Sequence, residues 1–366
     1  MSENINVLYR SATGIGSMPH EDPVRALELI KETLPWGPHW PQLSGRGRRE
    51  GFLRQFLNLP VELGLIELEK GESPFFCDQA NDWPEKVAKF YELYLECQDN
   101  KSNSNTLNDA LFNSALPREN TAGFYQFLDE NWESLSCKPK YLKGQLSGPL
   151  SVGLQINAAN GIPAFYREEL RDLITKTLAL TARLQVQSLK RFFLPVVIFI
   201  DEPLLLSYGQ SPYISLSREH IVQSLEAVVI SIREAGAYAG VHSCSGGDWS
   251  ILFQLPLDIV NFDAYGFLDS MLAYGEELEG FLRRGGCLGW GLVPTSEPVV
   301  QEDAFSLREK FYEGIRRLSR QGVSPDILAD QFLLTPSCGT GTLSLAQCEQ
   351  VYRTTAELHK LLLSSV

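Results

Sequence analysis

The sequence predicts a single-domain α/β protein of the (β/α)8, or TIM-barrel, type, and three observations support this. Apolar segments alternate with amphipathic helical segments along the 366 residues, which is typical of a parallel sheet. About eight such strand–helix units are present, which favours a closed barrel over an open sheet. Polar residues stand at the C-terminal ends of the expected strands, and in a barrel these ends lie on the same, catalytic face. No long Pro/Ser/Gly linker interrupts the chain, so we expect one domain over 1–366.

The expected strands are short apolar segments that end in polar or turn residues. In order they lie in TGIGS (13–17), YLKGQLSGP (141–149), PVVIFIDEP (195–203), AYAGVHSC (237–244), LDIVNFDAY (257–265), CLGWGLVP (287–294) and FLLTPSC (332–338). One more strand is expected between Trp40 and Leu68, where PQL and ELGLIEL compete for the role.

Segments with helical spacing of apolar residues separate these strands. They run from about Asp22 to Leu34, over 84–98, from about Tyr166 to Lys190, from the capping residue Ser217 to about Glu234, from about Asp303 to Arg320, and from Ser344 onward. The polar, Asn/Ser-rich stretch 99–108 is typical of a surface loop, and we expect an insertion in the barrel near residues 99–122.

Composition excludes several classes of protein. Hydrophobic residues make up 44% of the chain and charged residues 21%, which indicates a globular protein with a large core. The net charge is −13, and the basic residues are scattered except for Arg46, Arg48 and Arg49, so we expect no nucleic-acid partner. The longest apolar run, Phe192 to Ile200, is about half of a membrane span, so we expect no membrane contact. Seven cysteines and a start without signal-peptide features predict free thiols in the cytoplasm.

Three residues have the chemistry of a zinc site. His242 and Cys244 are two apart at the end of an expected strand, so both side chains project to one face. Cys338 follows the last expected strand, whose end should lie at the same edge of the barrel. Ordinary core and loop residues are the alternative interpretation, because seven cysteines make a close pairing with a histidine unsurprising. The position where a buried strand meets a loop favours a metal site.

Five short motifs occur in the order and at the spacing known from one enzyme family. They are GIGSMP (14–19), LSGPLSV (146–152), IDEP (200–203), HSC (242–244) and PSCG (336–339). These motifs are spread over nearly the whole chain, and through them the chain resembles the C-terminal catalytic barrel of the cobalamin-independent methionine synthases. That family belongs to a larger group with the uroporphyrinogen decarboxylases and the methylcobamide:thiol methyltransferases.

The resemblance implies a Zn²⁺ ion bound by His242, Cys244, Cys338 and an acidic residue. Asp263 is our choice for the acidic ligand, at a position where the family usually has glutamate. A carboxylate at a strand end that caps the following segment is the alternative interpretation of Asp263.

The resemblance also implies where homocysteine binds. Ser17 would meet its carboxylate and Asp201 its ammonium group, and a buried strand-end carboxylate does need such a cation. Glu72, in a Gly-Glu pair, would help to hold the amino group, although a solvated loop explains its surroundings equally well. Glu202 should point away from Asp201 along the strand and form a salt bridge to a neighbouring helix.

These expectations predict a zinc-dependent methyltransferase that converts homocysteine to methionine through a metal-bound thiolate. Methyltetrahydrofolate and a methylated corrinoid protein are equally plausible methyl donors. The alternatives are a methylcobamide-dependent methyltransferase acting on another thiol, a decarboxylase of the uroporphyrinogen type, and a non-catalytic barrel that binds zinc or a thiol.

Overall fold

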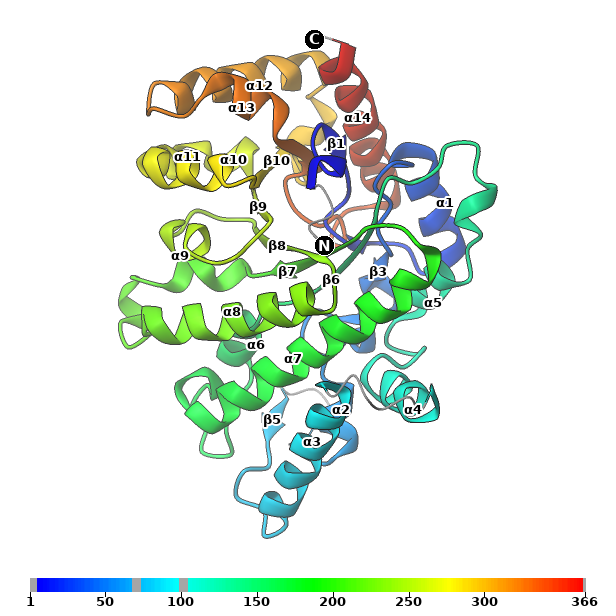
Figure 1. Ribbon diagram of the computed structural model, residues 1–366, viewed down its shortest axis with the longest axis vertical. Coiled ribbons are helices and arrows are strands. Elements are labelled where there is room, and N and C mark those ends of the chain that lie inside the picture. Colours follow the sequence, from blue (N-terminus) through cyan, green and yellow to red (C-terminus); the bar gives the residue numbers. More distant parts are fainter. Residues whose placement is uncertain (1–4, 68–73, 99–104, 365–366) are drawn as a thin grey trace.

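A parallel seven-stranded sheet, curled into a half-barrel and surrounded by helices, forms the centre of the protein (Figure 1). The computed structural model describes residues 5–67, 74–98 and 105–364. The strands follow the spatial order β1-β11-β10-β9-β8-β7-β6. Their bounds are β1 Ser11–Ala12, β6 Leu142–Ser147, β7 Val196–Asp201, β8 Tyr238–Ser243, β9 Ile259–Phe262, β10 Cys287–Val293 and β11 Phe332–Pro336.

Four further short strands form two separate pairs. β2 (Ser17–Met18) pairs in parallel with β3 (Gln42–Leu43), and His39 forms an isolated parallel bridge with Lys143 of β6. Of the two candidates for the second strand, PQL is therefore the one beside the first strand. ELGLIEL instead contributes β4 (Ile66–Glu67), which pairs antiparallel with β5 (Phe75–Phe76).

Two of the expected helices begin at the predicted capping residues. Asp22 accepts a hydrogen bond from the backbone of Val24 (2.9 Å), and Ser217 accepts one from His220 (3.4 Å), so each caps a helix. The helices are α1 Pro23–Thr33, α2 Asn58–Glu62, α3 Trp83–Gln98, α4 Asn105–Ala115, α5 Ala122–Leu128, α6 Pro149–Gln155, α7 Glu168–Leu189, α8 Arg218–Glu234, α9 Ser250–Phe253, α10 Ala264–Met271, α11 Gly275–Arg283, α12 Ala304–Ser319, α13 Pro325–Asp330 and α14 Leu345–Ser364.

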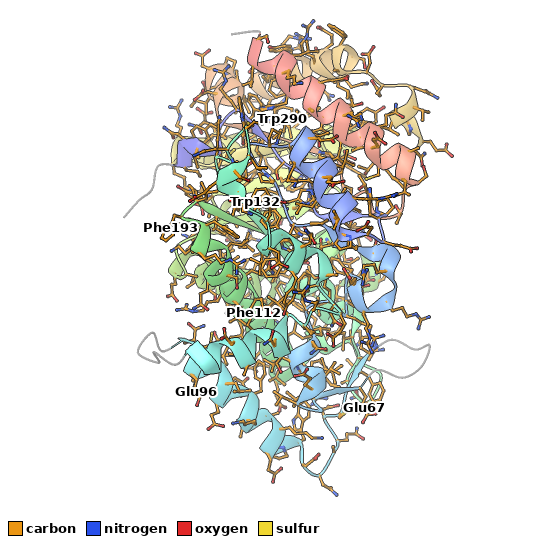
Figure 2. The ribbon with its side chains drawn as sticks, turned by 90° about the vertical axis from the view of Figure 1, so that its right-hand side faces the viewer. Glu67, Glu96, Phe112, Trp132, Phe193 and Trp290 are labelled. Carbon is orange, nitrogen blue, oxygen red and sulfur yellow. The ribbon has the colours of Figure 1, made fainter. Side chains whose placement is uncertain are left out.

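The expectation of a loop over 99–108 is wrong at its end, because α4 begins at Asn105. Leu111 and Ala115 of this helix are buried. The ring of Phe112, which is labelled in Figure 2, lies tilted beside that of Phe124 of α5 with centroids 6.1 Å apart. Helices are stabilised mainly by packing of an apolar face, so this contact outweighs the polar start of the segment. Residues 99–104 lie outside the described part of the chain.

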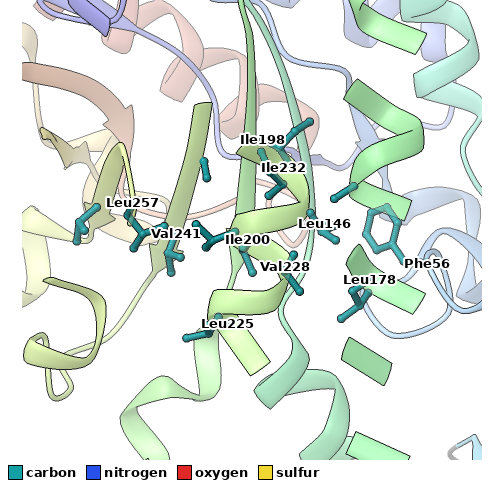
Figure 3. Close-up of a cluster of buried hydrophobic side chains, with 14 of the residues drawn as sticks. Phe56, Leu146, Leu178, Ile198, Ile200, Leu225, Val228, Ile232, Val241 and Leu257 are labelled. Atoms are coloured by element: carbon teal, nitrogen blue, oxygen red, sulfur yellow. The ribbon is translucent and has the colours of Figure 1, made fainter. Parts of the chain in front are cut away.

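The core has one layer outside the sheet and a smaller one inside its curl. Outward-facing Ile198 and Ile200 of β7 pack with Val241 against Val228 and other residues of the covering helices (Figure 3). The alternate side chains of β7, Val197 and Phe199, face inward. They pack with residues in or next to other strands, among them Leu8, Tyr141, Ile259, Cys287 and Leu333. Asp201 continues this inward row at the carboxyl end of the strand.

None of the helices in the described ranges is both long and apolar enough to cross a membrane.

Candidate metal centre

His242, Cys244 and Cys338 lie together at the carboxyl edge of the sheet. One ligand atom from each side chain lies within 4.8 Å of the others, so the three residues could hold a metal ion. His242 is 3% exposed, and both cysteines are partly buried. Gly291 allows the backbone just before Cys338 to lie close to β10, because a Cβ at position 291 would be only 2.9 Å from the Cα of Ser337. The sequence prediction that these residues converge is confirmed.

A hydrogen-bonded pair on neighbouring strands orients the imidazole of His242. Nδ1 of His242 lies 2.5 Å from Oδ1 of Asn261, and Nδ2 of Asn261 donates to Oγ1 of Thr335 over 2.9 Å. Because the amide nitrogen faces Thr335, the amide oxygen faces the imidazole, and Nδ1 donates the proton. Nε2 is buried and has no hydrogen-bond partner among the described residues. In the neutral ring it therefore presents a lone pair, as a metal-binding histidine must.

Sequence reasoning missed Asn261, although a signal was present. Asn261 is a polar residue inside the apolar strand LDIVNFDAY, and it pairs in register with His242. Gly289 on β10 leaves the space that the Asn261 side chain occupies, because a Cβ at Gly289 would overlap it.

The two thiols differ in proton affinity. The hydrogen bond with Cys338 lowers the pKa of Cys244 to about 4; burial opposes this shift, and His242 supports it. The same hydrogen bond, together with burial, raises the pKa of Cys338. The opposite shifts describe one proton shared between the two sulfurs, which favours the thiolate form at one sulfur of the pair. Thiolates are the form in which cysteine binds metals.

The imidazole carries more positive charge than its burial alone would allow. Burial lowers the pKa of His242, but Cys244, Asp201 and Asn261 together raise it above its ordinary value. A metal ion bound at this cluster would compete with the protons that the imidazole and the sulfurs otherwise hold.

Asp263, predicted as the acidic ligand, makes a different contact in the structure. Its Oδ1 accepts a hydrogen bond from the backbone of Gly266 over 2.7 Å, so Asp263 caps helix α10. It is not in the group of ligand atoms within 4.8 Å of one another. Burial raises the pKa of Asp263 to about 6, with smaller effects of His242 and Cys244 that show its proximity to the centre. Its role as a ligand stays a prediction.

Asp201 is a buried carboxylate beside this cluster. It pairs in register with His242, is 9% exposed, and its Oδ1 has no hydrogen-bond partner among the described residues. Burial raises the pKa of Asp201 to about 6, while the charges of His242 and Lys143 oppose the shift. A buried carboxylate oxygen without a donor is costly, and an ammonium group would satisfy it.

Lys143 is a second charged residue that sequence reasoning missed. Its side chain is fully buried, and Nζ donates to the backbone oxygen of Ile15 (2.6 Å) and to Oε1 of Gln145 (3.1 Å). Burial lowers the pKa of Lys143 to about 7, and Asp201 partly offsets this effect. A lysine inside the apolar strand YLKGQL was the available signal. Lys143 places an amino group inside the curl of the sheet, near Asp201.

Ser17 lies against the segment that carries Cys338. The backbone oxygen of Ser17 accepts hydrogen bonds from the nitrogen (2.8 Å) and Oγ1 (2.9 Å) of Thr340. The nitrogen of Gly341 is 3.4 Å from Ser17 Oγ, to which it donates. The first and last strands of the chain thus meet at the centre. Glu72 lies outside the described residues.

Glu202 faces away from Asp201 as expected, but its partners differ from the expected salt bridge. Its carboxylate accepts hydrogen bonds from the backbone nitrogens of Leu150 (2.8 Å) and Ser151 (2.9 Å) and from Ser151 Oγ (2.6 Å). These groups belong to the first turn of α6, whose unpaired N–H groups favour an anion. The helix N-terminus therefore takes the place of the basic side chain that we expected.

No protein-family model matches this chain, and a search of curated proteins finds no match either. The function is therefore inferred from the chain's own residues.

Proposed function

We propose that this protein is a zinc-dependent methyltransferase that transfers a methyl group to the thiol of homocysteine and so forms methionine. The observation that carries the proposal is the cluster of His242, Cys244 and Cys338 with Asp201 beside it, whose Oδ1 has no hydrogen-bond partner among the described residues. The motifs that resemble cobalamin-independent methionine synthases contain all four of these residues.

The proposal includes a closed (β/α)8 barrel in one domain. The pairing of β2 with β3 and the bridge between His39 and Lys143 support it, because they join the first strand to β6 across the gap in the seven-stranded sheet. In such a barrel all strand ends face one mouth, where the cluster would lie.

The donor set supports zinc among the common metals. One imidazole and two sulfurs are ligands that zinc prefers, whereas magnesium and calcium prefer oxygen. His242, Cys244 and Cys338 would hold the ion, and a three-residue set leaves a position for a substrate. When bound, zinc supplies the Lewis acidity that keeps an acceptor thiol deprotonated at neutral pH.

The chain's own residues then select the acceptor. Oδ1 of Asp201 would receive the ammonium group of an amino acid, and Ser17 would receive its carboxylate. The polar atoms of Thr340 and Gly341 hold Ser17 in place beside Cys338. A thiol without an amino group would leave Asp201 unpaired, which favours homocysteine over simple thiols. Methyltetrahydrofolate and a methylated corrinoid protein remain the two candidate donors.

Metal analysis of Cys244→Ser beside Cys137→Ser tests the proposal. We expect about one zinc per chain in the wild type and in Cys137→Ser, and much less in Cys244→Ser, because loss of a ligating thiolate weakens zinc binding severely. Cys137 is a matched control, since it is a partly buried free cysteine outside the cluster.

A methyl-transfer assay with homocysteine and either donor follows on the same proteins. Turnover by the wild type and Cys137→Ser, but not by Cys244→Ser, would support the enzyme. Full zinc retention in Cys244→Ser would contradict the ligand assignment, and zinc binding without turnover would favour the non-catalytic alternative.

A further inference from the structure

A group of arginines stands out in this acidic chain, and the proposed chemistry makes no use of it. Arg46, Arg48, Arg49 and Arg54 lie within residues 44–55, here called the arginine loop, in a protein of net charge −13. Arg46 is neutralised, because its Nε lies 2.7 Å from Oε1 of the buried Glu50. The other three make no ion pair with any carboxylate in the described part of the chain.

These three guanidinium groups are close enough to disfavour one another. Arg48 and Arg49 are exposed, while Arg54 is partly buried, and its Nε is buried without a hydrogen-bond partner among the described residues. Burial and the positive charges of Arg49 and Arg48 lower the pKa of Arg54. An uncompensated cluster of this kind is stabilised by an anion that contacts several of its members.

The side chains also border a recess of suitable size. Arg49 and Arg54 line a cavity of about 180 Å³ together with Asn58 and Asn120. The amide of Asn58 already donates to Glu62 and Ser114, whereas Asn120 Nδ2 has only a long contact of 3.5 Å to Asn58 and can donate a further hydrogen bond. Glu119, the one acidic residue in this lining, forms no ion pair with either arginine. The recess is too small for a whole cofactor of the kinds considered, but it has room for one anionic group.

Two hydrogen bonds join the arginine loop to segments that adjoin the candidate metal centre. At one end, Ser44 Oγ donates to the backbone oxygen of Gly341, three residues after Cys338, over 3.2 Å. At the other end, the backbone oxygen of Phe52 accepts from Ser147 Oγ over 2.5 Å, and Ser147 pairs in register with Asp201. The arginines therefore lie on a segment that adjoins the proposed methyl-transfer site on two sides.

We propose that Arg48, Arg49 and Arg54 form a subsite for the anionic arm of the methyl donor. This inference rests on the proposed function and adds the chemistry by which the donor is held. Both candidate donors carry such an arm: the glutamyl carboxylates of methyltetrahydrofolate, or the phosphodiester of a corrinoid. Guanidinium groups bind either anion through paired, charge-assisted hydrogen bonds. The arm fixes the donor at the rim, and the methyl group is left free to face the acceptor thiol.

The double variant Arg48→Gln/Arg49→Gln tests the subsite, with Arg320→Gln as control. Arg320 is an exposed arginine at the C-terminal end of α12, and it also forms no ion pair with a described carboxylate. Equilibrium dialysis measures the Kd of methyltetrahydrofolate and of methylcobalamin without turnover, on zinc-loaded protein whose zinc content and circular dichroism match the wild type. We expect the double variant to bind the true donor about tenfold more weakly, and its affinity to lose most of its salt dependence.

Truncated donors locate the effect on the anionic arm. Methylcobinamide lacks the phosphodiester, and a methylated tetrahydropterin without the glutamyl group lacks the carboxylates. The double variant should bind these truncated compounds with the same affinity as the wild type. If the double variant loses affinity for only one of the two full donors, that donor is the one whose anionic arm the arginines bind.

Two outcomes would overturn the inference. One is equal affinity of the double variant and Arg320→Gln for both full donors; the other is no measurable binding of either full donor to the wild type. Because dialysis needs no homocysteine, failure of methyl transfer and failure of the subsite are separate results.

Discussion

The hydrogen bond between Asn261 and His242 provides the sharpest test of the metal centre. The substitution Asn261→Leu keeps a branched side chain of similar shape in this fully buried position but removes the acceptor of the Nδ1 proton. The imidazole then has a buried, unsatisfied N–H, which costs about 1–3 kcal/mol. It also loses the contact that keeps Nε2 directed at the two sulfurs. Substitution of such outer contacts typically costs about 10- to 100-fold in metal affinity, which is about 1.4 to 2.7 kcal/mol. The two ranges agree.

Competition with a chromophoric chelator measures the zinc affinity of the wild type and of Asn261→Leu. Thr335→Val is the matched control, because it removes the partner of the Asn261 amide nitrogen but leaves the oxygen that faces His242. We expect a smaller loss in the control, about threefold, which corresponds to about 0.6 kcal/mol and so to the lower end of the net contribution of one neutral hydrogen bond. The free energy of unfolding of the metal-free proteins shows whether either variant is merely less stable. If Asn261→Leu bound zinc within twofold of the wild type, Asn261 would not orient the ligand.

Two further predictions concern buried charges. Asp201→Asn should raise the KM for homocysteine by about 10- to 100-fold, because it removes a charged partner of the ammonium group. Zinc content should stay the same, and so should the reaction with 2-mercaptoethanol, which has no amino group. An unchanged KM for homocysteine would show that Asp201 does not bind the substrate. Burial, aided by the charge of Lys143, lowers the pKa of His39 from 6.5 to about 3, so His39 stays neutral in the folded protein while the unfolded chain binds a proton below pH 6.5. This contribution to stability is complete above pH 6.5 and falls by about 1.4 kcal/mol per pH unit as the pH drops toward 3. Urea unfolding of the wild type and of His39→Gln at pH 7 and pH 4.5 should therefore show the wild type losing about 3 kcal/mol more than the variant, and identical losses would refute the assignment.

Much of the fold followed from local patterns. The strands at 196–201, 238–243 and 287–293 lie inside the predicted segments, because buried parallel strands are continuous apolar runs with polar ends. The caps Asp22 and Ser217 mark their helices correctly, since a cap depends on a contact only two or three residues away. The choice between PQL and ELGLIEL was open, because both segments are short and only pairing with the first strand separates them.

In the candidate site, the sequence by itself predicted that His242, Cys244 and Cys338 lie together. The spacing of His242 and Cys244 on a strand already places both side chains on one face, because side-chain direction repeats every two residues. The barrel-like alternation of strands and helices brings Cys338 to the same edge, since parallel strands end together. These conclusions need only the local geometry of the backbone and the order of the elements.

Only the tertiary structure decided how the surrounding polar residues are used. Asn261 holds His242 and Thr335 together, and Lys143 donates to the backbone of Ile15 between β1 and β2. Glu202 binds the start of α6 in place of a basic side chain. Each of these contacts joins segments many residues apart, so no local pattern identifies the partner. A buried polar group must be satisfied by whichever donor or acceptor the packed chain brings within about 3 Å, and that partner exists only once the sheet has curled and the helices have closed around it.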